Sequence, residues 1–268
     1  MGQIRFGAVA LGALAALFFM AAAGPARAAI KTEPVDYTIG NDAFEGYLAY
    51  DDALTGKRPG VVIYSAWTGI GDNERKHAQM LAKLGYVAFV ADIYGKGVHP
   101  KPPKEAAAES GKFAKDRALY RERAEAGLDQ LLKNPMVDAG RVAAIGYCFG
   151  GMGALELGRS GANIKAIVTY HGLLGTPTPQ DAKNIKAHVL ILNGADDPNA
   201  PPPVIAGFEK EMEGAHIDWQ LVSYGGAVHC FTDSAAGSDT SHGCAYNPEA
   251  DKRSWQATED FFHETLSN

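Results

Sequence analysis

The stretch Gly146-Tyr147-Cys148-Phe149-Gly150-Gly151 constrains the fold more than any other part of this sequence. It follows the apolar run 142–145 and precedes 152–155, which has the composition of a helix. The pattern G-x-C-x-G between a strand and a helix is typical of a nucleophile elbow, a strained turn that presents its central side chain. Glycines two residues before and after it remove side chains where strand and helix nearly touch. The stretch predicts an exposed Cys148 at a sheet edge; the alternative is a small cysteine buried in a tight turn.

Short apolar runs alternate with runs of helical period along most of the chain. We expect strands at Val35–Thr38, Phe44–Ala49, Pro59–Tyr64, Val87–Ala91, Val142–Ile145, Ile164–Tyr170, Ala187–Leu192 and Asp218–Ser223. We expect helices at Glu74–Leu84, Ala114–Leu132, from Pro201 onward and at Asp251–Glu264, and a surface excursion at 96–112. This alternation predicts a mostly parallel eight-stranded sheet with helices on both faces, the count of an α/β-hydrolase fold, in one domain at 29–268.

The first 28 residues have the pattern of an export signal rather than of folded structure. Arg5 precedes an apolar run at 6–23, and the small-residue ending Ala26-Arg27-Ala28 is a cleavage pattern. Cleavage there leaves 240 of the 268 residues and predicts an exported, periplasmic or secreted protein. The alternative is an uncleaved membrane anchor, since the apolar run is just long enough to span a bilayer.

The charge balance argues against a polyanionic partner. The chain carries 31 acidic and 25 basic residues, a formal net charge of −6. An acidic surface does not attract nucleic acid or anionic lipid, so we expect neither partner once the signal is removed. With 46% hydrophobic residues and no low-complexity block, the chain is expected to be globular, as a monomer or a small homo-oligomer.

Three cysteines in an exported protein suggest one pair and one free thiol. Cys230 and Cys244 lie in one loop rich in Gly, Ser and Asp and are the expected pair, which leaves Cys148 free. The alternative is that Cys230 and Cys244 are two free, inert thiols. His229, Cys230, His242 and Cys244 are residue types that bind metal, but the adjacency of His229 and Cys230 is poor ligand spacing, so no metal is expected.

A cysteine nucleophile needs a base and an acid that orients the base, and in this fold they follow in the order nucleophile, acid, histidine. Asp197 follows the strand expected at 187–192, although the adjacent Asp196 stays open as the alternative. His229 follows the last expected strand and is the candidate base. His171 ends a strand and is a weaker candidate for a contact with substrate.

With these residues in place, the chain resembles the dienelactone hydrolase family of α/β-hydrolases. The resemblance is carried by the elbow, by LAKLGYVAFVADIYG at 81–95, by HCF at 229–231 and by AYNPEADKRSW at 245–255. It implies hydrolysis of a carboxylic ester or lactone, a small-molecule substrate, by Cys148, Asp197 and His229, with no metal or organic cofactor. It also implies an oxyanion hole formed by the backbone N–H groups of Trp67 and Phe149.

Two departures from the family pattern bear on the substrate. Ala66 stands where dienelactone-cleaving members have a glutamate that governs the cysteine's charge. Lys96 and Asp233 stand at or near the places of two arginines that bind the substrate carboxylate. The resemblance thus suggests Trp67, Tyr94 and Lys96 as substrate contacts and a neutral or differently charged ester or lactone.

Two other classes of function remain open on the sequence. The missing glutamate suits a ligand carrier that binds without turnover on the same fold. An exported Cys148 also suits a thiol redox protein, although the sequence contains no C-x-x-C motif. Replacing Cys148 by alanine and testing whether the thiol cycles with reductants would separate these two from a hydrolase.

Overall fold

The computed structural model describes residues 1–3 and 29–267. The expected export signal, residues 1–28, falls almost entirely outside the described residues. Among the residues that are described, no helix is both long enough and apolar enough to cross a membrane.

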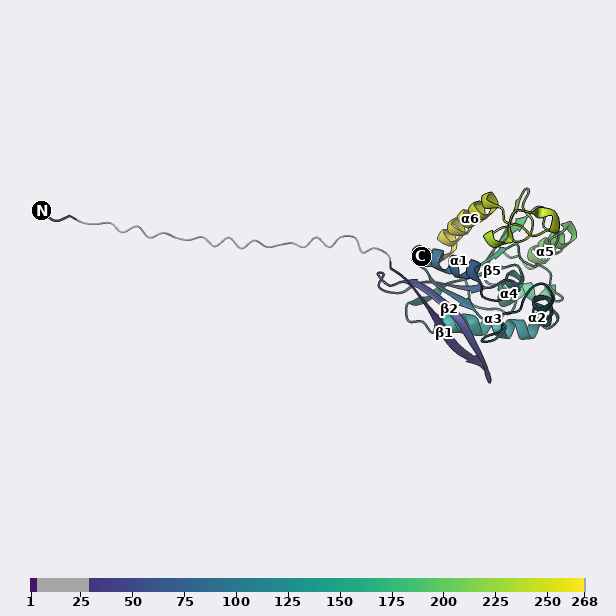
Figure 1. Ribbon diagram of the computed structural model, residues 1–268, viewed down its shortest axis with the longest axis horizontal. Coiled ribbons are helices and arrows are strands. Elements are labelled where there is room, and N and C mark those ends of the chain that lie inside the picture. The colour runs from purple at the N-terminus through teal and green to yellow at the C-terminus, as the bar shows by residue number, and fades with distance from the viewer. Residues whose placement is uncertain (4–28, 268) are drawn as a thin grey trace.

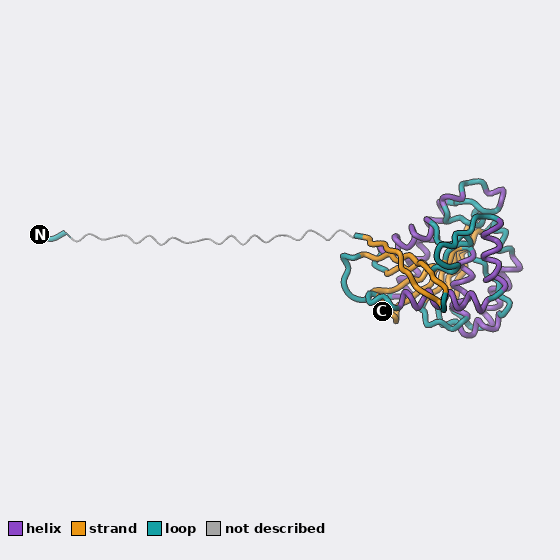
Figure 2. Tube along the Cα trace, turned by 60° about the horizontal axis from the view of Figure 1, so that its bottom comes forward, coloured by secondary structure: helices purple, strands orange, loops and turns teal. Residues whose placement is uncertain are grey.

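A single eight-stranded sheet runs through the molecule with helices on both sides (Figures 1 and 2). The strands are β1 (Ile30–Ile39), β2 (Asp42–Asp51), β3 (Arg58–Tyr64), β4 (Val87–Ala91), β5 (Val137–Tyr147), β6 (Ala166–Tyr170), β7 (His188–Gly194) and β8 (Trp219–Tyr224). Their spatial order is β1-β2-β4-β3-β5-β6-β7-β8. Pairing is antiparallel from β1 through β2 to β4 and parallel elsewhere. The predicted α/β fold, with its mostly parallel eight-stranded sheet, is therefore confirmed.

Two apolar clusters, one on each face, attach the helices to the sheet. The helices are α1 (Asp72–Lys83), α2 (Lys104–Lys115), α3 (Arg117–Leu132), α4 (Phe149–Arg159), α5 (Pro202–Gly214) and α6 (Pro248–Leu266), with 3₁₀ turns η1 (Pro179–Asn184), η2 (Ser234–Ala236) and η3 (Thr240–His242). Side chains of α1 and α6 pack on one face, and those of α2 to α5 belong to the cluster on the other. The central strands are buried on both faces, as continuous apolar runs require.

The structure corrects the sequence prediction in two respects, the nature of one segment and the length of three strands. The segment 96–112 is not simply a surface excursion, because α2 occupies its second half and buries Ala106 and Phe113. Strands β1, β2 and β5 are longer than predicted, and β1 and β2 form a hairpin at the sheet edge. Much of β1 is exposed, so its polar residues hide the strand from a search for apolar runs.

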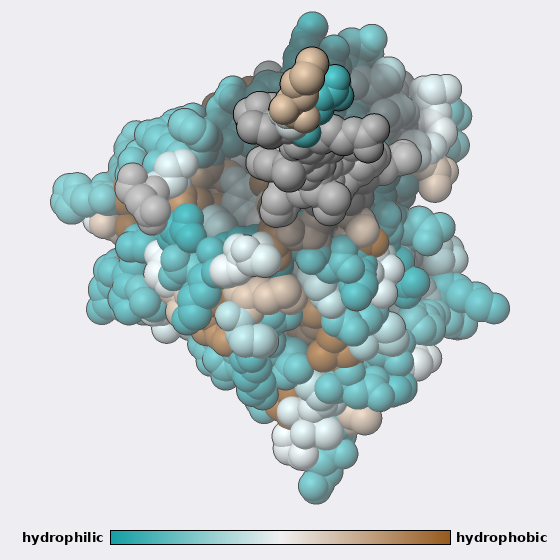
Figure 3. Space-filling model, turned by 90° about the vertical axis from the view of Figure 1, so that its left-hand side faces the viewer, coloured by the Kyte–Doolittle hydropathy of each residue, from teal (hydrophilic) through white to brown (hydrophobic). Residues whose placement is uncertain are grey.

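The side of the molecule seen in Figure 3 is mostly hydrophilic, with apolar residues scattered among polar ones. Within the described residues, the large apolar side chains left exposed are Met1, Leu54, Leu84, Val98 and Leu132. This distribution is ordinary for a globular domain.

Candidate active site

Cys148 is the single residue between β5 and α4, and its backbone has φ 53° and ψ −116°. A positive φ is uncommon for a residue other than glycine, and residues with such strained backbone cluster at functional sites. The glycines beside it make this turn possible. A Cβ on Gly146 would lie 2.0 Å from the carbonyl oxygen of Gly150, and a Cβ on Gly150 would lie 2.1 Å from that of Tyr64. Within the described residues Cys148 is the free cysteine, and it is half-buried.

Hydrogen bonds and stacking hold the turn in this conformation. The Cys148 N–H donates to the carbonyl of Tyr170 on the neighbouring β6, at 3.1 Å. The Cys148 carbonyl accepts from the N–H groups of Gly151 (3.0 Å) and Leu173 (3.2 Å). Phe149 begins α4, so its N–H has no acceptor within the helix. Its ring stacks on Tyr120 with centroids 4.6 Å apart.

His229 and Asp197 meet at the same edge of the sheet. The imidazole Nδ1 of His229 lies 2.8 Å from Oδ2 of Asp197, and both side chains are buried. Asp197 Oδ1 also accepts the N–H of Asn199 at 2.8 Å, which fixes the carboxylate. The alternative acid, Asp196, is exposed and makes no such contact. The structure thus brings His229 to Asp197 rather than to its neighbour.

The charge state of His229 depends on its two partners. Burial lowers the pKa of His229, but interactions with Asp197 and the Cys148 sulfur outweigh burial and raise it to about 10. His171 lies beside it, with ring centroids 5.0 Å apart, and its Nε2 contacts Thr232 Oγ1 at 2.9 Å. Burial and the neighbouring His229 lower the pKa of His171 well below its ordinary value. The pair therefore combines a cationic imidazole with a neutral one.

A disulfide closes the segment that carries His229. Cys230, the next residue, is bonded to Cys244. Two backbone hydrogen bonds join the same two segments. The N–H of His229 donates to the carbonyl of Gly243 (3.1 Å), and the N–H of Ala245 donates to the carbonyl of His229 (3.0 Å). The backbone of His229 is therefore fixed by these bonds, and its imidazole is fixed by Asp197. No group of residues that could hold a metal occurs in the described part of the chain.

Trp67 lies in the loop between β3 and α1, and the loop's hydrogen bonds leave its N–H without a protein acceptor among the described residues. The carbonyl of Trp67 accepts from the hydroxyl of Tyr94 at 2.8 Å. Ala66 precedes it, and the N–H of Ala66 donates to the carboxylate of Glu74 at 3.2 Å. Sequence reasoning missed Glu74, although its place as the third residue of a helix that follows a glycine is a known capping position.

A cavity of about 800 Å³ joins these residues. Its walls include Trp67, Cys148, Phe149, His171 and His229. Of the described residues that line it, none is lysine or arginine, and three carry a carboxyl group: Asp72, Glu74 and Asp233.

Two expected substrate contacts lie elsewhere. Lys96 is ion-paired on the surface with Asp36 (2.7 Å) and Glu45 (3.1 Å) and does not line the cavity. Tyr94 is also absent from the lining, and its hydroxyl donates to the carbonyl of Trp67. Trp67 is therefore the one of the three expected substrate contacts that the structure brings to the cavity.

A protein-family model covers most of this chain. Residues 44–266 match the model of the dienelactone hydrolase family. The chain belongs to the dienelactone hydrolase family. The protein is accordingly a hydrolase of the class that cleaves esters and lactones.

Relatives of this dienelactone hydrolase family member extend over nearly the whole chain. The solved structure of m3DLH is 42% identical, with a TM-score of 0.85 over 89% of this chain and 99% of that one. A dienelactone hydrolase-like promiscuous phosphotriesterase from metagenomic libraries is 39% identical, with a TM-score of 0.84 over 89% of this chain and 100% of that one. A probable 2-oxo-3-(5-oxofuran-2-ylidene)propanoate lactonase of Bradyrhizobium sp. is 28% identical over 85% of this chain and 92% of its own length.

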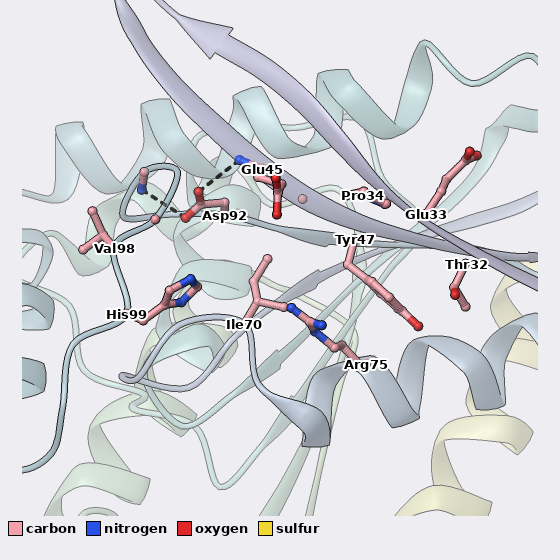
Figure 4. Close-up of a pocket in the computed structure, with 13 residues that line it drawn as sticks. Thr32, Glu33, Pro34, Glu45, Tyr47, Ile70, Arg75, Asp92, Val98 and His99 are labelled. Atoms are coloured by element: carbon pink, nitrogen blue, oxygen red, sulfur yellow. Dashed lines mark hydrogen bonds between the residues drawn. The ribbon is translucent and has the colours of Figure 1, made fainter.

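A second cavity in this hydrolase, of about 320 Å³, lies among β1, β2, the start of α1 and the segment after β4 (Figure 4). Its lining contains none of Cys148, Asp197 and His229. The buried Asp92 there already accepts the backbone N–H groups of Glu45, Tyr94 and Gly95. We therefore place the candidate active site in the larger cavity.

Proposed function

We propose that the protein hydrolyses a carboxylic ester or lactone with Cys148 as nucleophile, His229 as general acid and base, and Asp197 as the residue that orients His229. One observation carries this proposal: a cysteine in an elbow and a histidine bonded to a buried carboxylate line the same cavity. In the alternative assignment, Asp196 would act as the acid, but it is exposed and lacks the contact with His229.

In the first half of the reaction, the Cys148 sulfur attacks the carbonyl carbon and forms a carbon–sulfur bond. The carbonyl oxygen becomes an oxyanion, which the N–H groups of Trp67 and Phe149 stabilise. Removing one such donor typically lowers the rate about 10²- to 10³-fold. The oxyanion then collapses, the carbon–oxygen bond to the leaving group breaks, and the imidazolium of His229 gives that oxygen a proton.

In the second half, water attacks the thioester while the now neutral His229 accepts a proton from it. The tetrahedral intermediate collapses and releases a carboxylic acid and the Cys148 thiolate. A lactone gives a single hydroxy acid, because its leaving oxygen stays attached. Asp197 stabilises the charged imidazole and keeps Nδ1 turned away from the reaction.

The lining of the cavity favours a neutral substrate. It contains apolar side chains such as Trp67, Phe149 and Met152. An anionic substrate would meet Asp72, Glu74 and Asp233 there, without a lysine or arginine to pair with it. We therefore propose that the protein prefers neutral esters or lactones over substrates that carry a carboxylate.

The test is hydrolysis of matched substrates by the purified protein. Neutral aryl esters, lactones and an aryl ester with a carboxylate on its acyl chain are compared, with Cys148→Ala and Cys148→Ser in parallel. We expect the highest kcat/KM for a neutral substrate and no turnover by Cys148→Ala. If the alanine variant turned over as wild type does, Cys148 would not be the nucleophile.

The same experiment addresses two other functions. Binding of the substrates without turnover would indicate a ligand carrier. Reduction of a disulfide substrate by Cys148 would indicate a thiol redox protein. The latter would need an external partner, because the other two cysteines are bonded to each other.

A neutral phosphotriester is a second candidate substrate. The observation that favours it is the 39% identity to a protein described as a promiscuous phosphotriesterase, together with a cavity whose described lining contains no lysine or arginine. Attack by Cys148 on phosphorus would release an aryl alcohol and leave a phosphorylated sulfur. Release of the aryl alcohol by wild type but not by Cys148→Ala would support it.

We also propose that the protein is exported and works outside the cytoplasm. The disulfide between Cys230 and Cys244 supports this, since such bonds persist in oxidising compartments. Fractionation of cells that express the full chain, with the mass of the recovered protein, tests both export and cleavage after Ala28.

A further inference from the structure

We propose that Glu74 is a positioning residue for this reaction, which fixes the loop 65–71 so that the N–H of Trp67 faces the developing oxyanion. This inference rests on the function proposed above, because it assigns Glu74 a task within that reaction. It does not require Glu74 to touch the substrate or the Cys148 sulfur.

Glu74 binds the loop at both of its ends. One carboxylate oxygen accepts the N–H of Gly71, at 3.0 Å, directly before α1. The other accepts the N–H of Ala66, at 3.2 Å, directly before Trp67. The single side chain therefore spans the loop and links its two ends to the first turn of the helix.

Capping of the helix does not account for both contacts. Glu105 in the first turn of α2 accepts one backbone N–H, that of Lys101 at 3.1 Å, and is exposed. Glu74 is only 3% exposed, and its second oxygen serves the loop rather than the helix. Burial raises the pKa of Glu74 although both backbone hydrogen bonds act to lower it, and Asp233 adds to the rise. The carboxylate thus occupies a costly position that capping alone does not require.

The remaining contacts of the loop complete the orientation of the Trp67 N–H. The peptide between Ala66 and Trp67 is planar, so its C=O and N–H point in opposite directions. Its carbonyl accepts the N–H of Gly69 at 3.0 Å, and the next carbonyl, that of Trp67, accepts the Tyr94 hydroxyl at 2.8 Å. Glu74 holds the N–H just before this peptide. Together these contacts direct the free N–H of Trp67 away from the loop's own acceptors.

Such a role predicts a loss that appears in acyl transfer and not in other reactions of the thiol. The donor matters only when an oxyanion forms, and small misplacements of catalytic groups lower rates steeply. Alkylation of Cys148 by iodoacetamide forms no oxyanion. Comparing acylation with alkylation therefore separates the positioning of Trp67 from changes in the thiol itself.

The experiment compares wild type, Glu74→Gln and Glu74→Ala in three measurements: kcat and KM for a neutral aryl ester, the single-turnover acylation rate, and the rate of alkylation. Glutamine offers one acceptor oxygen and one NH₂ group, so one of the two loop N–H groups loses its partner. We expect acylation to fall roughly 10- to 100-fold in Glu74→Gln, with KM and alkylation unchanged. Glu105→Gln removes an exposed carboxylate in the first turn of α2 that also accepts a backbone N–H, and it serves as the matched control, with acylation unchanged.

Two results would overturn the inference. If Glu74→Gln were acylated at the same rate as wild type, the loop would need no carboxylate. A parallel fall in acylation and alkylation would show that Glu74 acts on the thiol or on folding as a whole. Failure of the proposed function is distinguishable from both, since it would appear as turnover that persists in Cys148→Ala.

Discussion

The turn that carries Cys148 and the segment that carries His229 border the same cavity, but they are held by different means. The turn is fixed by backbone packed against backbone: Gly146 lies against Gly150 of the same turn, Gly150 lies against Tyr64 at the end of β3, and neither leaves room for a side chain. The segment around His229 is fixed by contacts between distant residues, namely the disulfide to Cys244 and the hydrogen bond to Asp197. The nucleophile is thus positioned by backbone sterics, and the base by a disulfide and a side-chain hydrogen bond.

This difference predicts that a side chain added in the turn prevents folding, whereas removing one contact of the His229 segment lowers activity or stability only in part. The largest effect is expected for Gly150→Ala, because its Cβ would lie 2.1 Å from a backbone carbonyl oxygen that cannot move aside. We expect a loss of about 5 kcal/mol or more in the free energy of unfolding, enough to leave little folded protein. Urea denaturation of the purified variant, or its recovery as soluble protein, measures this.

The matched control is Gly207→Ala in α5, where an added Cβ meets nothing within 4 Å. This change is expected to stabilise the protein by about 0.5 to 1 kcal/mol, since alanine favours the helix. A stable Gly150→Ala protein would contradict the steric account of the turn.

The next largest effect is expected at the other side of the cavity, for Asp197→Asn. We expect turnover to fall about 10³- to 10⁴-fold with little change in stability, because the imidazole loses its charged partner. The hydrogen bond with Asp197 helps raise the pKa of His229 to about 10, so protonated His229 is lost as pH rises through that value. Without Asp197 the pKa falls, and the alkaline decline of kcat should move to lower pH. An unmoved alkaline decline would show that it reports another group.

Removal of the disulfide is expected to have a smaller effect, on stability first. Cys230 and Cys244 are 14 residues apart, and closing a loop of that length typically contributes about 3 kcal/mol. Cys230→Ala with Cys244→Ala should lower the free energy of unfolding by that amount and reduce kcat, because the backbone of His229 loosens. Cys148→Ala is the control for loss of a thiol without loss of a bond. Unchanged stability in the double variant would mean that the hydrogen bonds alone hold the segment.

The smallest effect concerns His77 of α1, whose ring stacks on that of Tyr147, the residue before Cys148, at 5.0 Å. Burial lowers the pKa of His77 to about 4, although a hydrogen bond to Asn73 opposes the shift. His77 therefore binds a proton below about pH 6.5 in the unfolded chain but only below about pH 4 in the folded protein. The free energy of unfolding falls as pH falls through this interval. Between pH 7 and pH 5 the loss is about 2 kcal/mol.

Urea denaturation of His77→Phe at both pH values measures this contribution. The phenyl ring keeps the stacking and cannot titrate, so the variant should lack this part of the pH dependence. If wild type and variant lost stability equally between the two pH values, other groups would be responsible.

The contrast between the two regions also explains how much could be predicted from the sequence. The elbow motif lies within five residues of the chain, so the spacing of Gly146, Cys148 and Gly150 alone indicates the turn. Buried parallel strands are equally visible because they are continuous apolar runs. The helix α2 was missed because most of its side chains are exposed and its few buried ones give a weak apolar pattern.

Contacts between distant segments were not predictable in the same way. The resemblance drew attention to Ala66, where a glutamate is absent, but a buried carboxylate reaches the same loop from Glu74, eight residues later. Lys96 follows the strand end as a substrate contact would, yet it pairs with Asp36 and Glu45 of the edge hairpin. In both cases position along the chain says little about which groups meet in space.

The most direct test of the central claim is the intact mass of the protein during reaction with a slowly hydrolysed aryl ester, followed by peptide mapping. We predict a mass increase equal to one acyl group, located on the peptide that contains Cys148 and absent from Cys148→Ala. Turnover without any acyl adduct on Cys148, or with the adduct on another residue, would contradict the account.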